Sequence, residues 1–251
     1  MSETNYLMEE MSWPEVESAL EDVSGVLVPV GSHEQHGPHL AESSDAIRAE
    51  RFAGLLGERM YPELLIAPTI NLGVSQHHMA FPGTITLRPS TLQSILFDVV
   101  KSLHQHGLER FIIYNAHGGN TAPIEVAMEE IRAELDVKLV SLMHSDFVGD
   151  MIDELVESET YGHSCEYEVS EVLHLAPERV DEENLSSGEV KEFCSTYMDT
   201  EASIAADFHE LTANGALGDA RKASRKLGKK IIEAALDEVE KFLQAFLNDF
   251  S

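Results

Sequence analysis

Carboxylate and imidazole side chains follow the first apolar run of this 251-residue chain closely enough to share a metal ion. Glu34 and His36 alternate on an extended segment, so they project to the same side and offer one oxygen and one nitrogen ligand. Asp45, nine residues after His36, adds a short carboxylate that can bridge two ions. Imidazole ligands favour a transition metal over calcium. A polar surface loop is the alternative, and the buried strand expected directly before this segment argues against it.

A second histidine lies in a glycine turn that follows another apolar run. His117 precedes Gly118 and Gly119, and Asn120 ends the turn. Glycines allow the backbone to approach a ligand closely, and loops at the carboxyl ends of parallel strands are where α/β sheets bind ligands. A phosphate-binding turn is disfavoured, because the segment lacks the lysine of a P-loop and the spacing of a dinucleotide motif. We therefore expect His117 to lie beside the first group.

A third segment combines His163 with several glutamates. Glu166 follows His163 by three residues, which places both on one face if a helix begins at the histidine. Such a pair could complete a metal site and transfer a proton. The pattern alone does not separate Glu166 from Glu168, and in so acidic a segment Glu168 and Glu171 could instead be solvated surface.

Short apolar runs alternate with helical patterns along most of the chain. Strands are expected at residues 26–30, 64–66, 84–87, 111–114 and 137–143. Helices are expected at about residues 44–57, 91–106 with Ser90 as the cap, 121–135, 165–175 and 220–248. This alternation predicts an α/β fold, a three-layer α/β/α domain with a mostly parallel central sheet. No composition break divides the chain, so residues 1–251 are interpreted as a single domain.

The charge balance excludes several classes of partner. Subtracting 45 acidic from 17 basic side chains leaves a formal charge of −28, which repels nucleic acid and anionic lipid. Such acidity is typical of proteins from high-salt cytoplasm, and we interpret the chain as halophilic. It shows neither a secretion signal nor a long apolar run, so a cytoplasmic location without membrane contact is expected. Residues 150–210 carry eighteen acidic and two basic side chains and are expected to be solvated surface with one helix. The basic cluster within residues 221–230 is interpreted as a pairing face for that segment or for another subunit.

Five segments in order resemble the creatininase family of metal-dependent amide hydrolases. They are residues 28–39 (VPVGSHEQHGPH) with Asp45, 76–78 (QHH) with 81–84 (FPGT), 115–120 (NAHGGN), the segment around His163, and 214–219 (NGALGD). The resemblance covers most of the chain, and five ordered segments are far more specific than any single one. It implies a creatininase-like fold and a homo-oligomer, commonly a hexamer in this family.

The resemblance also implies a centre of two divalent transition-metal ions, whether zinc, iron or manganese. Glu34, Asp45 and His117 would hold one ion, and His36 with the bridging Asp45 would begin the site of the other. Creatinine-hydrolysing members carry a tyrosine and a ligating glutamate where this chain has two glycines, so Glu166 is predicted to supply the missing carboxylate. His163 matches the family's proton-transfer histidine, with Glu166 beside it. The substrate-binding residues are expected to be Ser75, His78, Gly118, Gly119 and Asn120.

These inferences predict a hydrolase of a non-peptide C–N bond in a small-molecule substrate. The favoured substrate is a formamide, a ring-opened purine ribonucleotide of archaeal flavin or deazaflavin synthesis. Arg48, Arg88 and Lys101 are potential partners for its phosphate. Lactam opening of creatinine and peptide trimming in cofactor maturation are the alternatives within the family. An inactive metal-binding protein or a metal store is the alternative outside it.

Overall fold

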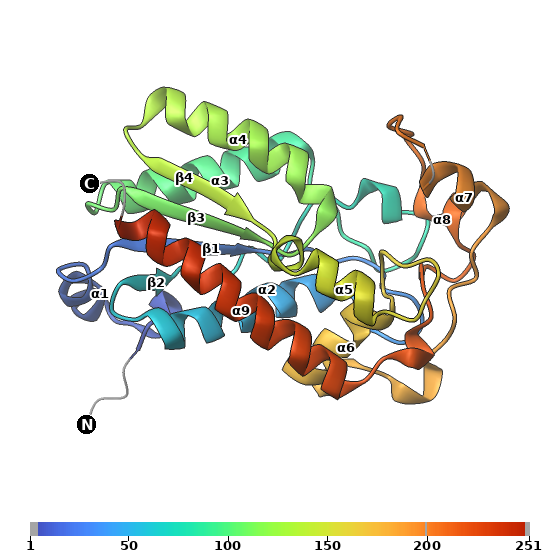
Figure 1. Ribbon diagram of the computed structural model, residues 1–251. Coiled ribbons are helices and arrows are strands. Elements are labelled where there is room, and N and C mark those ends of the chain that lie inside the picture. Colours follow the sequence, from blue (N-terminus) through green and yellow to red (C-terminus); the bar gives the residue numbers. More distant parts are fainter. Residues whose placement is uncertain (1–4, 199, 249–251) are drawn as a thin grey trace.

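Four parallel strands form the centre of the protein (Figure 1). The computed structural model describes residues 5–198 and 200–248. The strands are β1 (Gly25–Val30), β2 (Leu64–Ile66), β3 (Arg110–Asn115) and β4 (Lys138–Leu142), in the spatial order β2-β1-β3-β4. The predicted mostly parallel sheet is therefore confirmed.

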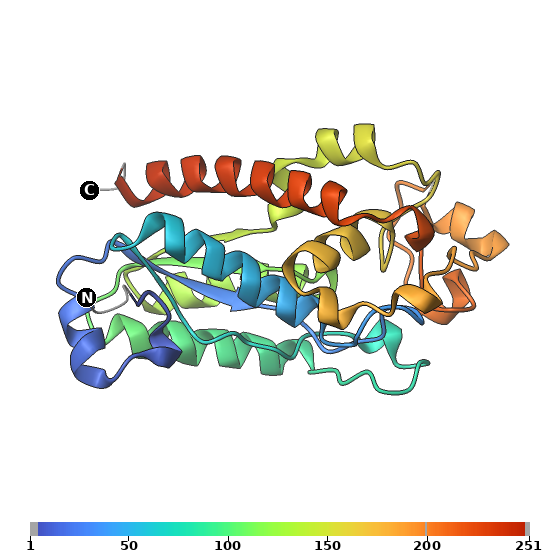
Figure 2. The same ribbon diagram turned by 90° about the horizontal axis from the view of Figure 1, so that it is seen from below.

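Both faces of the sheet are apolar and covered by helices, which confirms the three-layer prediction. Successive strand residues point to opposite faces. Val28 and Ile113 pack on one face with residues of α3 (Pro89–His104) and α4 (Thr121–Glu134). Leu27, Ile112 and Tyr114 pack on the other face with residues of α2 (Ser44–Met60) and α9 (Arg225–Asn248). Figure 2 shows the sheet between these two helical layers. The strands β1, β2 and most of β3 are thus buried on both sides, as continuous apolar runs predict, whereas β4 is only partly buried except at Leu142.

The remaining helices lie outside this framework. They are α1 (Trp13–Ala19), α5 (Gly149–Leu155), α6 (Glu166–Leu175), α7 (Glu192–Met198) and α8 (Phe208–Leu211). Short 3-10 helices at Gln76–His78 and Gly118–Asn120 follow β2 and β3. The pair α7 and α8 lies beyond the carboxyl ends of the strands (Figure 1). Within the described ranges, no helix combines the length and apolarity needed to cross a membrane.

Two local predictions about residues 84–90 are wrong. The segment 84–87 forms only isolated bridges, from Ile85 to His33 and from Thr86 to Gly73, and joins no named strand. It lies between a proline–glycine turn and a proline, and Ile85 is 50% exposed, so it lacks the two buried faces of the central strands. Ser90 does not cap the next helix. That helix begins at Pro89, whose fixed φ and missing N–H suit the first helical position.

The acidic segment and the last helix also differ from expectation. Residues 150–210 contain α6, α7 and most of α5 and α8, rather than one helix. Glu168 and Glu171 are buried, not solvated. The last helix begins at Arg225, after a short 3-10 turn at Ala220–Lys222. From the basic cluster, Lys222 donates to the carbonyl of Glu157 in the acidic segment, 2.7 Å away.

A close approach between α6 and α9 depends on one glycine. A Cβ at Gly228 would lie 1.8 Å from the carbonyl oxygen of Ser170 and 2.8 Å from the amide of Glu171. Both are backbone atoms of α6, so they cannot rotate away. This contact sets how deeply α9 packs beside the helix that carries Glu168 and Glu171.

We predict that Gly228→Ala destabilises the fold by about 1–3 kcal/mol or more, the usual range for overpacking a buried contact. Gly54→Ala in α2 is the matched control, because no described atom lies within 4 Å of its Cβ position. That control should be neutral or stabilise by up to about 1 kcal/mol, since alanine is the better helix former. Free energies of unfolding from denaturant titration measure both. Equal effects of the two substitutions would contradict the proposed close contact.

Candidate metal centre

Loops that leave the carboxyl ends of neighbouring strands bring the predicted ligands to one place. Glu34 and His36 follow β1, His117 follows β3, and Asp45 lies in the first turn of α2. All four side chains are buried, with Glu34 fully inaccessible and His117 the most accessible at 5%. The parallel sheet accounts for this convergence, because all its strands end at the same edge.

Asp45 stands between two imidazoles. Its Oδ1 lies 3.2 Å from Nε2 of His36, and its Oδ2 lies 3.2 Å from Nδ1 of His117. Ser32 also donates a hydrogen bond to Oδ2, at 2.7 Å. Glu34 completes the group with Oε2 at 3.2 Å from Nε2 of His117. The four side chains therefore lie together in the way the bridging arrangement requires, while their role as ligands stays a prediction.

The donor set fits a divalent cation. Both carboxylate oxygens of Glu34 are buried and have no hydrogen-bond partner among the described residues. Burying an ionised carboxylate in this state is costly unless a cation compensates it. His36 donates through Nδ1 to the carbonyl of Glu34 at 3.1 Å, so Nε2 is the nitrogen that faces Asp45 and could bind an ion once its proton is lost. Glu34, Asp45 and His117 form one group whose ligand atoms lie close enough to hold an ion.

A second such group consists of His36, His163 and Glu168, and Glu166 belongs to none of those found among the described residues. The carboxylate of Glu166 instead accepts hydrogen bonds from the backbone of Glu157 and Ser158, at 3.0 and 3.1 Å. The expectation that Glu166 completes the metal site and assists His163 does not fit this geometry. The helix begins at Glu166, so His163 lies before it and the expected shared face does not exist.

A buried ion-pair network centred on Arg48 contacts the carboxylates of Asp45, Glu168 and Glu171. Arg48 contacts Glu168 at 2.9 Å, Glu171 at 2.7 Å and Asp45 at 3.4 Å. His144 lies 2.9 Å from Glu171, and Tyr114 contacts the other nitrogen of His144 at 2.7 Å. Arg48 is therefore committed to three carboxylates, and the prediction that it binds a substrate phosphate does not fit the structure.

The buried charges shift one another's protonation in the metal-free protein. Burial disfavours the charged form of His36 and His117, but the neighbouring Asp45 and Glu34 outweigh it and raise the pKa of each histidine to about 9. Burial raises the pKa of Glu34 to about 7, against the opposing effect of His117. For Asp45, burial is outweighed by the two imidazoles, which hold its pKa well below its usual value. In the metal-free protein, protons on His36 and His117 therefore supply the positive charge that a bound cation would supply.

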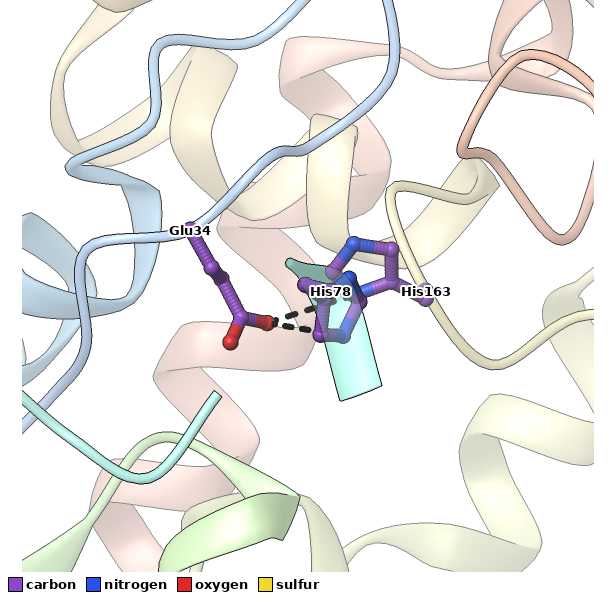
Figure 3. Close-up of side chains that lie close together, drawn as sticks. All are labelled: Glu34, His78 and His163. Carbon is purple, nitrogen blue, oxygen red and sulfur yellow. Dashed lines mark ion pairs between the residues drawn. The ribbon is translucent and has the colours of Figure 1, made fainter. Parts of the chain in front are cut away.

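Two further histidines face Glu34 on its other oxygen. Figure 3 shows His78 and His163 on the same side of this carboxylate, with Nε2 of His78 at 3.4 Å and Nδ1 of His163 at 3.9 Å from Oε1. Burial, together with neighbouring imidazoles, lowers the pKa of both histidines. Two neutral rings therefore lie next to the proposed ion site, which suits contact with an uncharged carbonyl group.

The other predicted substrate residues differ in what surrounds them. Ser75 lies with its hydroxyl 3.5 Å from Nε2 of His117. Asn120 is a structural residue, because its side chain accepts from Val74 at 2.8 Å and donates to Gly31 at 3.0 Å. No atom of the described residues lies within 4 Å of the position that a Cβ on Gly118 would occupy. A Cβ at Gly119 would instead lie 2.3 Å from the carbonyl of Val74, so this position excludes a side chain.

Sequence reasoning missed two residues at the centre. Gln35 contacts both His78 and His163 with its side-chain amide. Phe208 of α8 stacks on His78 with ring centroids 4.2 Å apart and meets His163 edge-on at 4.7 Å. Gln35 could have been noticed by its place between two predicted ligands. Phe208 had no local signal, because it is a single aromatic residue in an acidic segment far along the chain.

Comparison with known proteins identifies what this arrangement resembles. The creatininase family profile, described as creatinine amidohydrolase, matches residues 9–243. Creatinine amidohydrolase of Pseudomonas putida is 29% identical over 92% of this chain and 93% of its own. Mycofactocin precursor peptide peptidase of Mycolicibacterium smegmatis is 29% identical over 82% of this chain and 78% of its own. A crystal structure of creatininase superposes with a TM-score of 0.80, at 27% identity, over 98% of this chain and 99% of its own. A zinc form of a creatininase mutant and a manganese form of creatininase superpose with TM-scores of 0.82 and 0.77, both at 26% identity over 97% of this chain and 99% of their own.

Exchanging the two glutamates one at a time tests which of them holds metal. We expect Glu168→Gln to lower bound metal by about 10-fold or more, because it removes a negative ligand from the group with His36. Glu166→Gln is the matched control and should keep its metal, because its carboxylate binds backbone amides of residues 157 and 158. Metal content by elemental analysis, together with thermal unfolding, separates loss of metal from loss of fold. The reverse pattern, with metal lost only in Glu166→Gln, would contradict the assignment.

Metal binding should release protons, because His36 and His117 have pKa values of about 9 and are protonated at pH 7 in the metal-free protein. The raised pKa values stabilise the metal-free fold below pH 6.5, and this contribution is lost as pH rises through about 9. Metal affinity should therefore increase from pH 6 to pH 9, with between about two and three protons released at pH 7, because Glu34, with a pKa of about 7, is also partly protonated there. Calorimetric titration with zinc in buffers of different ionisation enthalpy counts these protons. A count of zero at pH 7 would show that the histidines are already neutral.

Proposed function

This chain belongs to the creatininase family of metal-dependent amidohydrolases, and we propose that within the family it hydrolyses the C–N bond of a formamide. The observation that carries the proposal is the glycine turn after His117. Gly119 has no room for a Cβ, which would lie 2.4 Å from Nε2 of His117. The ligating glutamate that the resemblance places there in creatinine-hydrolysing members therefore has no counterpart at this position. Creatinine opening is disfavoured for that reason.

The burial of the candidate metal centre favours a substrate with a small acyl group. Glu34, Asp45 and His117 are at most 5% exposed, and Phe208 covers the imidazoles of His78 and His163. A formyl group is the smallest acyl group that an amide can carry, so it requires the least space beside buried ligands. The rest of the substrate could then extend past Gly118, where the Cβ position is open.

The residues of this chain divide the work of hydrolysis between them. Glu34, Asp45 and His117 would hold one divalent cation, and His36 with Glu168 the other. When bound, the cations supply an activated water and polarise the carbonyl of the substrate. His163 donates through Nε2 to the backbone carbonyl of Gln35 at 2.8 Å, which leaves Nδ1 free to accept a proton on the Glu34 side. His163 can then pass that proton to the departing nitrogen.

The formamide that we propose to test first is the ring-opened purine ribonucleotide. Its phosphate is anionic and this chain has a formal charge of −28, so a positively charged group is needed to bind the phosphate against the overall repulsion. Arg48 is committed to the buried network, whereas Arg88 and Lys101 are exposed. Binding of the phosphate would therefore depend on exposed arginine or lysine side chains, on a bound cation, or on a neighbouring subunit of the homo-oligomer that we expect.

Peptide cleavage is a second candidate, favoured by the relatives. Mycofactocin precursor peptide peptidases are as similar in sequence to this chain as creatinine amidohydrolase is, at 29% identity. A peptide would need a wider entrance than a formyl group, so α8 with Phe208 would have to move away from the imidazoles.

We predict that the zinc-, manganese- or iron-loaded protein hydrolyses the formamide at least about 10-fold faster than creatinine or a dipeptide. The physical reason is that hydrophobic or steric misfit of even one small group costs about 1–3 kcal/mol in an enclosed site. Release of formate, creatine or a free amine measures the three reactions. Removing metal with a chelator, or replacing Asp45 with asparagine, should lower turnover more than about 100-fold.

Two outcomes would overturn this proposal. Faster cleavage of the dipeptide would assign the protein to peptide processing. Bound metal without turnover of any of the three substrate classes would also contradict a formamide hydrolase.

A further inference from the structure

The side-chain amide of Gln35 lies between the two imidazoles that face Glu34. Its Nε2 is 2.8 Å from Nδ1 of His78 and 3.2 Å from Nε2 of His163. The same nitrogen donates to the carbonyl of Gly215 at 3.1 Å, and Oε1 accepts from the amide of Gly37 at 2.9 Å. Gln35 is 5% exposed, so protein groups surround its amide almost completely.

These neighbours fix which end of the amide is which. The backbone N–H of Gly37 can only donate, and the carbonyl of Gly215 can only accept. Rotating the amide by half a turn would place two acceptors together at Gly215 and two donors together at Gly37. The NH₂ group of Gln35 therefore faces His78, and its two hydrogens are directed to Nδ1 of His78 and to the carbonyl of Gly215.

The orientation of Gln35 determines the tautomer of His78. Because Nδ1 accepts a hydrogen bond, the ring proton of neutral His78 is on Nε2. This Nε2–H faces Oε1 of Glu34 at 3.4 Å (Figure 3). Stacking of Phe208 on the ring, with an interplanar angle of 25°, keeps the imidazole in this plane.

His163 has the opposite tautomer. Its Nε2 donates to the backbone carbonyl of Gln35 at 2.8 Å, so its Nδ1 carries the lone pair, and the 3.2 Å approach of the Gln35 side-chain nitrogen to this Nε2 is a contact and not a hydrogen bond. That Nδ1 lies 3.9 Å from the same oxygen of Glu34. Gln35 therefore determines the tautomer of His78 with its side chain and the tautomer of His163 with its backbone carbonyl. Next to Glu34, His78 presents a hydrogen-bond donor and His163 presents an acceptor.

We propose that Gln35 is a positioning residue that holds His78 as an Nε2–H donor, and that His78 donates a hydrogen bond to the carbonyl oxygen of the bound amide. The second part rests on the proposed amide hydrolysis. A donor aimed at an oxygen that gains negative charge in the transition state accelerates such reactions. The proposal also assigns the group of Glu34, His78 and His163 as a substrate site rather than a third ion site, because a ligating imidazole nitrogen cannot carry a proton.

The tautomer can be measured without any substrate. Long-range ¹H–¹⁵N correlation spectra of protein labelled at histidine nitrogen distinguish Nε2–H from Nδ1–H. His78→Gln assigns the signal by its loss. We expect wild-type His78 to be Nε2–H in the metal-free protein and to remain so after titration with zinc. A wild-type His78 protonated on Nδ1, or one that loses its ring proton when zinc binds, would overturn the proposal whatever the substrate.

Gln35→Glu tests the positioning role. A carboxylate can still accept from Gly37, but it cannot donate to His78, so the ring proton should move to Nδ1. We expect kcat to fall on the order of 10²-fold for whichever amide the wild type hydrolyses, with KM and metal content nearly unchanged. Gln105→Glu is the charge-matched control at an exposed site near the end of α3 and should retain wild-type kcat.

A second pair of variants keeps the test decisive if Gln35→Glu is unstable. His78→Gln places an amide donor near the former Nε2, whereas His78→Leu removes it. We expect kcat of His78→Gln to exceed that of His78→Leu by about 10-fold or more. Equal kcat in the two variants, with both still folded and metal-loaded, would overturn the donor role. Wild-type inactivity toward formamides, with the expected tautomer present, would instead contradict only the proposed substrate.

Discussion

A fully buried glutamate whose carboxylate accepts no hydrogen bond is the constraint around which this protein is organised. Both oxygens of Glu34 lack hydrogen-bond partners among the described residues, and four histidines lie within ion-pairing distance of it or of Asp45. Such a carboxylate is unfavourable in a folded protein unless positive charge is supplied. In the metal-free state protons on His36 and His117 provide it. A divalent cation provides it more completely, so the same feature that strains the fold creates affinity for metal.

The parallel sheet allows this concentration of charge to persist. Strand ends fix the backbone of the ligand loops, and the apolar layers on both faces hold the strands. Behind the ligands, Arg48 contacts three carboxylates, which keeps Asp45 and Glu168 from repelling each other apart. Arg48 also pairs with Glu171. Glu171 contacts His144, and His144 contacts Tyr114 through its other ring nitrogen. The centre therefore depends on a chain of contacts that crosses the core from α6 to β3.

The sequence was informative where a residue's place followed from a strand end, and less so elsewhere. Glu34, His36 and His117 come directly after apolar runs, so a parallel sheet alone brings them together. Glu166 was predicted on the assumption that a helix includes His163. The chain instead turns at Ser164, which has a positive φ of 49°, and the helix begins afterwards. This turn places Glu168, rather than Glu166, beside His36. Phe208 reaches the centre from a separate helix, a long-range contact that no local pattern encodes.

The glycine pair after His117 and the carboxylate on α6 are best understood as one structural arrangement. A side chain at residue 119 would collide with Val74 and with His117 itself, so position 119 cannot supply a ligand. Glu168 of α6 instead lies in the candidate ion group with His36, and the amide of Ser164 donates to its carboxylate at the start of the helix. As a ligand there, Glu168 would supply the negative charge that position 119 cannot, while the space next to Gly118 stays open. A carboxylate supplied by the helix rather than by position 119 would therefore give the substrate side of the proposed ion site a different shape while leaving the site its charge.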